Sequence, residues 1–180
     1  MRRTLRKEEV DWFDEPAEVI DILTDEPSPD ALTSAVYVFA FAGNELLLTK
    51  PRGSDQWALP GGERRAGEAP EEAGRRLVND ASGCELGEVH RFGWQQVRFA
   101  GDVPKDWGFG ADSYIRLYVA EVVGASDLQA ANRRFFPPVE ARAEPSVQDN
   151  HLLYEEALLM TLAATESSGR KRGKRARSER

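Results

Sequence analysis

Cysteine and histidine are scarce in this chain of 180 residues, which contains one cysteine and two histidines. Cys84 alone cannot form an intrachain disulfide, and this favours a reducing, cytoplasmic compartment. It occupies an apolar position, so we expect a buried core thiol rather than a nucleophile. His90 and His151 have no further ligand at the spacing of a metal-binding motif, so neither is a strong metal candidate.

Long hydrophobic runs are also missing. The longest one, residues 35–42, is far too short to cross a bilayer as a helix. The first thirteen residues, MRRTLRKEEVDWF, are charged and lack the apolar core of a secretory signal. We therefore expect neither a membrane segment nor a secretory signal.

Charge is unevenly distributed along the chain. Residues 167–180 hold seven of the 24 basic side chains and one of the 31 acidic ones, which leaves 17 basic and 30 acidic residues, a net −13, on residues 1–166. This acidic body argues against broad nucleic-acid binding through the domain itself. The basic tail is predicted to be disordered, and it could contact a nucleic acid or another acidic partner, act as a solubility tail, or fold back on the acidic body.

Residues 57–84, WALPGGERRAGEAPEEAGRRLVNDASGC, predict a short strand over Trp57–Leu59, a glycine turn, a charged loop and one helix. Gly61 and Gly62 allow backbone conformations that are closed to residues with a Cβ. Pro70 suits the first turn of a helix, and Gly83 is a typical residue just beyond its end.

The spacing of this segment resembles the signature of the Nudix family, which hydrolyses nucleoside diphosphates linked to another moiety. The positions that match are Gly62, Glu68, Arg76, Val78, Gly83 and Cys84. The resemblance implies an α/β/α sandwich, with a mixed sheet between the signature helix and a C-terminal helix. It also implies Mg²⁺ or Mn²⁺ held by glutamates on a pyrophosphate, a base that activates water, and, by family habit, a homodimer.

The metal-binding positions depart from the family pattern. Leu77 and Ala81 stand where the family has glutamates, and Asp80 stands where it has another. These positions share one helix face, where a divalent ion needs several oxygen ligands. We predict Asp80 as the remaining metal ligand and catalytic group, unless it belongs to a surface ion ladder with Glu72 and Arg76. We also predict Glu68 and Arg76 as catalytic-site residues, whose role, by resemblance, is largely to hold the loop to the helix.

Several residues outside the helix are candidates for substrate binding. Gly61 and Gly62 match the family lead-in, and Lys50 and Arg52 precede them in a polar loop where they could face a phosphate or be merely solvated. The aromatic side chains of the loop at residues 100–110 could stack on a base or cover the core. These two residues are Trp107 and Phe109.

We divide the chain into an N-terminal extension at 1–30, a domain at 31–166 and a tail at 167–180. In the extension we expect one or two short elements that pack on the domain edge. Apolar periodicity predicts strands over 33–41, 45–49, 85–99 and 113–122, a strand at Phe135 and Phe136, and a second helix over 148–165.

Three hypotheses follow for function. The first is a protein that binds a nucleotide or related diphosphate and hydrolyses it weakly or not at all, in which case no metal is needed. The alternative is an active pyrophosphohydrolase with a rebuilt Mg²⁺ or Mn²⁺ site. The third is a non-catalytic interaction module that uses the basic tail.

Overall fold

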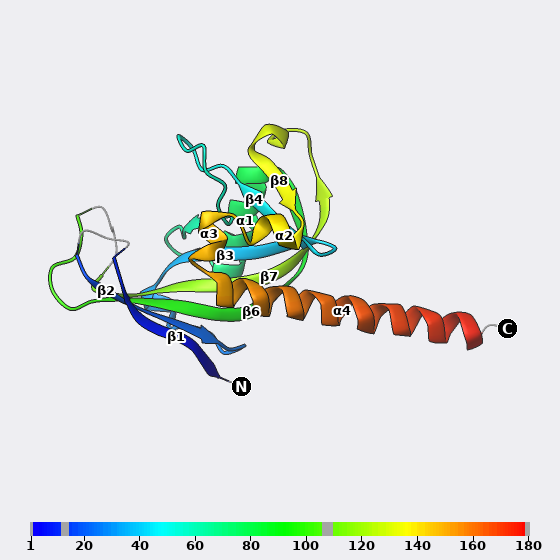
Figure 1. The fold of residues 1–180 in the computed structure, drawn as a ribbon, viewed down its shortest axis with the longest axis horizontal. Coiled ribbons are helices and arrows are strands. Elements are labelled where there is room, and N and C mark those ends of the chain that lie inside the picture. The colour runs from blue at the N-terminus through cyan, green and yellow to red at the C-terminus, as the bar shows by residue number, and fades with distance from the viewer. Residues whose placement is uncertain (1, 12–14, 106–109, 179–180) are drawn as a thin grey trace.

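A mixed β-sheet forms the centre of the molecule in the computed structural model, which describes residues 2–11, 15–105 and 110–178 (Figure 1). The strands run in the order β1-β2-β6-β7-β3-β4-β8, and β5 pairs with β3 off this path. All neighbours are antiparallel except β3 and β7, which are parallel. The strands of the described chain are β1 Arg3–Val10, β2 Ala17–Leu23, β3 Thr33–Ala42, β4 Glu45–Thr49, β5 Gly61–Glu63, β6 Cys84–Phe99, β7 Asp112–Ala125 and β8 Arg133–Phe136.

Strand β3 lies in the interior of the sheet and is apolar on both faces. Phe39 and Phe41 belong to one buried cluster, whereas Val36 and Val38 belong to another. This double burial explains why the sequence here is a nearly continuous run of apolar β-formers. The strands predicted over 33–41, 45–49, 85–99 and 113–122 are confirmed.

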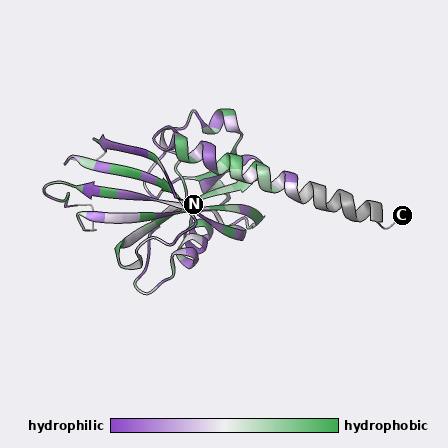
Figure 2. Ribbon diagram, turned by 90° about the horizontal axis from the view of Figure 1, so that it is seen from below, coloured by the Kyte–Doolittle hydropathy of each residue, from purple (hydrophilic) through white to green (hydrophobic). Residues whose placement is uncertain are grey.

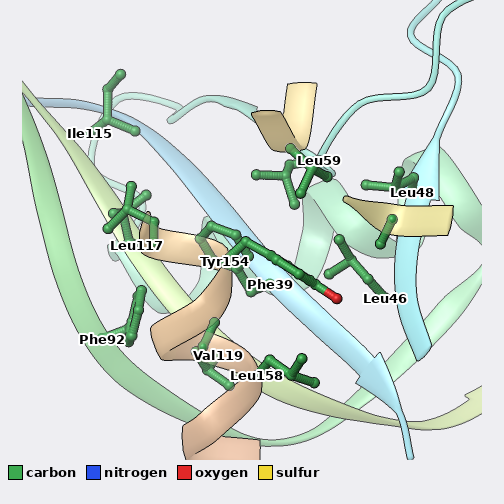
Figure 3. Packing of buried hydrophobic residues seen from close by; sticks show 14 of the residues in the cluster. Phe39, Leu46, Leu48, Leu59, Phe92, Ile115, Leu117, Val119, Tyr154 and Leu158 are labelled. Carbon is green, nitrogen blue, oxygen red and sulfur yellow. The ribbon is translucent and has the colours of Figure 1, made fainter. Parts of the chain in front are cut away.

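Two helices cover the two faces of the sheet. Helix α1, Pro70–Ser82, buries Ala73 and Val78 in the cluster that contains Val36. Helix α4, His151–Ser178, places Tyr154 and Leu158 in the other cluster, together with Phe39 (Figure 3). The predicted α/β/α sandwich with a mixed sheet is therefore confirmed.

The strand predicted over Trp57–Leu59 is wrong. Ala58 makes only an isolated bridge with Thr49, and the strand β5 begins three residues after Ala58, at Gly61. The glycines are thus part of the sheet rather than a break in it. Because Gly61 lacks a side chain, the backbone of β5 can approach Tyr37 on β3 closely enough to pair with it.

Helix α4 differs from the predicted second helix at both ends. Residues 145–148 form a separate short helix, α3, which follows another short helix, α2, at Pro138–Ala141. The backbone of α4 remains helical to Ser178, so most of the tail that we predicted to be disordered is helical (Figure 1). Arginine and lysine are good helix formers and the tail lacks proline, which accounts for the continuation. Hydrophobic residues occur along the part of α4 nearest the sheet (Figure 2).

The N-terminal extension contributes two strands to the sheet. Strand β1 pairs with β2, and β2 pairs along its whole length with β6, from Ala17↔Phe99 to Leu23↔Gly93. Cys84, at the start of β6, is buried as expected. Among the helices of the described residues, none has the length and apolar character needed to cross a membrane.

Candidate functional site

Glu68 and Arg76 join the signature loop to helix α1. Arg76 Nε donates to Glu68 Oε1 at 2.6 Å, and Arg76 Nη2 donates to Glu68 Oε2 at 2.8 Å. The Arg65 backbone N–H donates to the same Oε2 at 2.9 Å. The Arg76 guanidinium, followed by the Arg65 N–H, lowers the pKa of Glu68 to about 2. This two-pronged contact fixes the loop on the helix, which is the role that the resemblance implied for these residues.

Gly61 and Gly62, the first two residues of β5, lie in the sheet next to α1. A Cβ on Gly61 would come within 2.5 Å of the Val36 carbonyl oxygen and closer still to the Tyr37 ring. Gly62 has a φ of 146°, which side-chain-bearing residues rarely adopt, and a Cβ there would lie 3.5 Å from Leu77. The loop thus contacts Tyr37 on one side and the divergent helix position on the other.

The helix face that should bind metal is largely apolar. Leu77 is half-buried and packs against the core cluster beneath α1, and Ala81 is also half-buried. The Asp80 side chain is 61% exposed, and its nearest described cation is Arg76 Nη1 at 3.7 Å. No group of three metal-ligating side chains occurs in the described parts of the chain. This donor set, one exposed carboxylate paired with an arginine, does not fit a divalent ion that takes six oxygen ligands.

The predicted ion ladder is only partly formed. Arg76 directs its closest contacts to Glu68, and its contact with Asp80 is the longer one. Glu72 appears in none of the ion pairs that the structure shows between described residues. Asp80 is therefore a weakly held surface carboxylate.

A cavity of about 370 Å³ lies on the α4 side of the sheet. Its floor is apolar and includes Phe39, Leu59 and Leu117, whereas Gln95, Ser146, Asp149 and Asn150 supply polar groups. The other lining residues are Tyr37, Ala58, Val97, Ile115 and Leu153. An apolar pocket with a few converging polar groups is the usual form of a small-molecule site.

Tyr37 connects this cavity to the signature loop. Its side chain lines the cavity, and its backbone pairs with Gly61 in the sheet. Burial raises the pKa of the Tyr37 hydroxyl above its ordinary value, so the phenol stays protonated and can donate a hydrogen bond.

The short helix before α4 supplies the hydrogen bonds that hold the far wall of the cavity. Ser146 Oγ donates to the Trp57 carbonyl oxygen at 3.0 Å. Asn150 Nδ2 donates to the Ser146 carbonyl oxygen at 2.9 Å. Trp57, which precedes β5, is therefore tied through Ser146 and Asn150 to the segment that leads into α4.

The predicted substrate residues are not all brought together. Lys50 Nζ lies 5.0 Å from the centre of the Trp57 ring, in a cation–π contact, and Arg52 is exposed. Neither side chain lines the cavity. Trp107 and Phe109 lie outside the described residues.

Sequence reasoning missed most of the cavity wall. Gln95 shares its strand face with Val97 and Phe99, both buried, so a polar residue at a core-facing position was the available signal. For Tyr37 and Asn150 no such signal exists, because only the folded sheet brings them next to the loop.

Comparisons with known proteins agree with this architecture. The family model described as NUDIX domain matches residues 31–157. A mutant of a pyrophosphohydrolase from Bacillus subtilis is similar at 18% identity, covering 92% of this chain and 98% of its own, with a TM-score of 0.59. A search of curated proteins gives no match.

Two further solved structures share the fold. The first is a MutT structure, from a study of Aliivibrio salmonicida and Vibrio cholerae, with 16% identity and a TM-score of 0.51. The match covers 69% of this chain and 94% of the MutT chain. The second is a NUDIX hydrolase from Nitrosomonas europaea, with 19% identity and a TM-score of 0.53. The match covers 68% of this chain and 88% of the Nitrosomonas europaea chain.

Proposed function

This chain belongs to the Nudix family, and from that premise we propose that it binds a compound containing a nucleoside diphosphate while hydrolysing it weakly or not at all. The ligand would occupy the cavity beside the signature loop, with its diphosphate near Gly61 and Gly62. Among the described residues, Tyr37 links these two places directly.

The observation that carries this proposal is the contrast between the loop and the helix face. The loop keeps its glycines and the Glu68–Arg76 contact, and this supports a retained site for a diphosphate. The helix face beside it presents Leu77 and Ala81 instead of glutamates. Losing one preorganised charge stabiliser commonly costs ~10²–10³ in rate, and two such positions are lost here.

The size of the cavity also supports a binding function. Small-molecule sites commonly have volumes of about 300–1,000 Å³. At about 370 Å³ the cavity suits a nucleobase or a similar ring system, with the charged part of the ligand outside it.

An active hydrolase with a rebuilt Mg²⁺ or Mn²⁺ site is the second candidate. Asp80 is exposed and only loosely paired, and Asp149 lines the cavity, so each could act as a ligand if other groups approached. Under this alternative, Asp80→Asn would abolish a metal-dependent turnover that the unmodified protein shows.

The tail and the domain limits complete the proposal. We propose that residues 31–166 form the Nudix-like domain, whose sheet the β1–β2 hairpin extends, and that the basic residues of 167–180 contact a nucleic acid or another acidic partner. A homodimer and a role as an interaction module alone are the further alternatives.

The test is a binding measurement without metal, beside a turnover assay with metal. We expect ADP-ribose or a related diphosphate to raise the melting temperature in EDTA. Turnover of dinucleotides, nucleotide sugars and nucleoside triphosphates in Mn²⁺ should stay at the metal-free rate. Normal turnover by the unmodified protein would contradict the proposal.

A matched pair of variants locates the binding site. Ala58→Phe places a ring in the cavity and should remove the ligand-induced shift. Ala143→Phe makes the same change at an exposed residue that does not line the cavity, and it should leave the shift intact. If both variants bind equally well, the ligand does not occupy this cavity.

A further inference from the structure

A chain of buried polar groups runs from the N-terminal strands to the cavity wall. Arg6 on β1 pairs with Asp21 on β2, with Nε and Oδ2 2.6 Å apart and only 10% and 1% of the side chains exposed. Asp21 Oδ1 accepts a hydrogen bond of 2.8 Å from Nε2 of Gln95, its register partner on β6. Arg6 Nη1 also donates to the Asp149 carbonyl oxygen at 2.9 Å. Arg6 and Asp21 both precede the family-matched residues.

These buried polar contacts allow only one orientation of the Gln95 amide. The Asp21 carboxylate has no hydrogen to donate, so the atom that faces it must be the amide nitrogen. Asn150 is fixed independently, because its Nδ2 donates to a backbone carbonyl of Ser146, which can only accept. The Asn150 Oδ1 then faces Gln95 Nε2 at 3.4 Å, in agreement with the first assignment.

Both N–H bonds of Gln95 are therefore directed at protein acceptors, and Oε1 is the group left for a ligand. No described residue donates a hydrogen bond to this oxygen. Ser146 Oγ uses its hydrogen on Trp57 and so offers lone pairs, and the Asp149 side chain is a carboxylate. Gln95, Ser146 and Asp149 all line the cavity, so the acceptors on its polar wall outnumber the donor that the Tyr37 hydroxyl offers.

We infer that the β1–β2 hairpin is a specificity element, which locks Gln95 so that the cavity selects a nucleobase bearing an exocyclic amino group. Gln95 is the contact residue, and Arg6 and Asp21 are positioning residues. This inference rests on the proposed binding of a nucleoside diphosphate in the cavity. A base without the amino group leaves the Gln95 oxygen unpaired in a buried site, and that loss weakens binding.

Two pairs of probes test the selection, each differing by one amino group. GDP is compared with IDP, and ADP with purine riboside 5′-diphosphate, by isothermal titration calorimetry on the full chain in EDTA. We expect the amino-bearing member of at least one pair to bind about tenfold more tightly. Equal affinities within both pairs would overturn the inference and leave the proposed function standing. Failure of every probe to bind would overturn both.

Variants then assign the selection to the hairpin. Gln95→Met removes the acceptor at nearly constant volume and should reduce the preference to less than about threefold, a residual set by shape alone. Asp21→Asn offers both donors and acceptors, so the Gln95 amide can invert and the preference should fall similarly. Because Asp21→Asn removes the carboxylate that faces Arg6 Nε in a buried pair, the double variant Arg6→Met/Asp21→Leu is measured beside it. A preference that survives in Gln95→Met and in the double variant would overturn the inference.

The adjacent residue provides a matched control. Gln96 is buried like Gln95, and its Nε2 donates to an aspartate, Asp112, at 2.7 Å. It points to the other face of the sheet and does not line the cavity. Gln96→Met and Asp112→Asn should therefore keep the full preference, and a loss there equal to that in Gln95→Met would show a general structural effect and overturn the inference.

Discussion

Restoring the two glutamates of helix α1 should create a metal site that the natural sequence lacks. In the double variant Leu77→Glu/Ala81→Glu, three carboxylates including Asp80 would share one helix face. Full burial of a leucine side chain is worth about 1.5–3 kcal/mol, and Leu77 is half-buried, so its loss should cost ~1–1.5 kcal/mol. Repulsion among the three carboxylates adds up to ~0.5 kcal/mol per pair.

The metal-free double variant should therefore be less stable by ~2 kcal/mol, which corresponds to a melting temperature lower by about 4–8 °C for a chain of this length. Mn²⁺ at a hundred times its dissociation constant should return about 2.7 kcal/mol, or roughly 5–11 °C. The assay is thermal unfolding followed by circular dichroism, in EDTA and in Mn²⁺.

The control for this experiment is Leu77→Gln/Ala81→Gln, which loses the same apolar contacts without gaining charge. It should melt at a similarly reduced temperature and show no response to Mn²⁺. Two results would refute the reasoning. A Mn²⁺ shift in the unmodified protein as large as that in the glutamate variant would mean that the site is already complete. The absence of any shift in the glutamate variant would mean that this face is not aligned for metal binding.

Three other substitutions test single features of the structure. Glu68→Gln removes a carboxylate whose pKa is lowered to about 2, so the unmodified protein should be more stable than the variant above pH ~4.5 and should lose this advantage as the pH falls toward 2. The unfolding midpoints of the two proteins should therefore converge across this pH range. A constant difference between the midpoints would contradict the prediction. Gly61→Ala places a methyl group against the Val36 carbonyl and the Tyr37 ring, so it should destabilise the protein by ~1–3 kcal/mol and weaken ligand binding. The control Gly101→Ala should do neither, because a Cβ at residue 101 meets no atom within 4 Å. Denaturant unfolding measures the stability change and calorimetry measures the binding change. Tyr154→Phe removes a buried hydroxyl that has no hydrogen-bond partner among the described residues, so it should be neutral or stabilising by up to ~1 kcal/mol in denaturant unfolding; a loss above ~1 kcal/mol would show that the hydroxyl is satisfied.

Local chemistry made the signature segment predictable. Pro70 and Gly83 mark the ends of α1 because proline suits a first helical turn and Gly83, with a φ of 68°, supplies the left-handed conformation that ends the helix. The Glu68–Arg76 contact followed from the family resemblance. Strand β3 was recognisable as a run of β-formers and β7 from its alternating pattern, because the middle residues of both strands are buried.

The cavity and the position of β5 could not be predicted in the same way. The cavity draws on five separate segments, and hydrophobic periodicity says which face is buried but not which buried faces meet. A glycine pair normally indicates a turn, but here Gly61 is in the sheet because the close approach to Tyr37 leaves no room for a side chain. The continuation of α4 to Ser178 was missed because charge composition outweighed helix propensity in the prediction.

Because β2 pairs with β6, the segment that must fold together is longer than the segment that matches the family. The family match starts at residue 31, yet Val19 and Ile22, on the hairpin before it, are almost fully buried. A chain trimmed to the matched residues would expose the open edge of β6 and uncover Trp94, inviting strand-to-strand association between copies. Any search for the smallest working version of this protein should therefore begin at the first strand rather than at the family boundary.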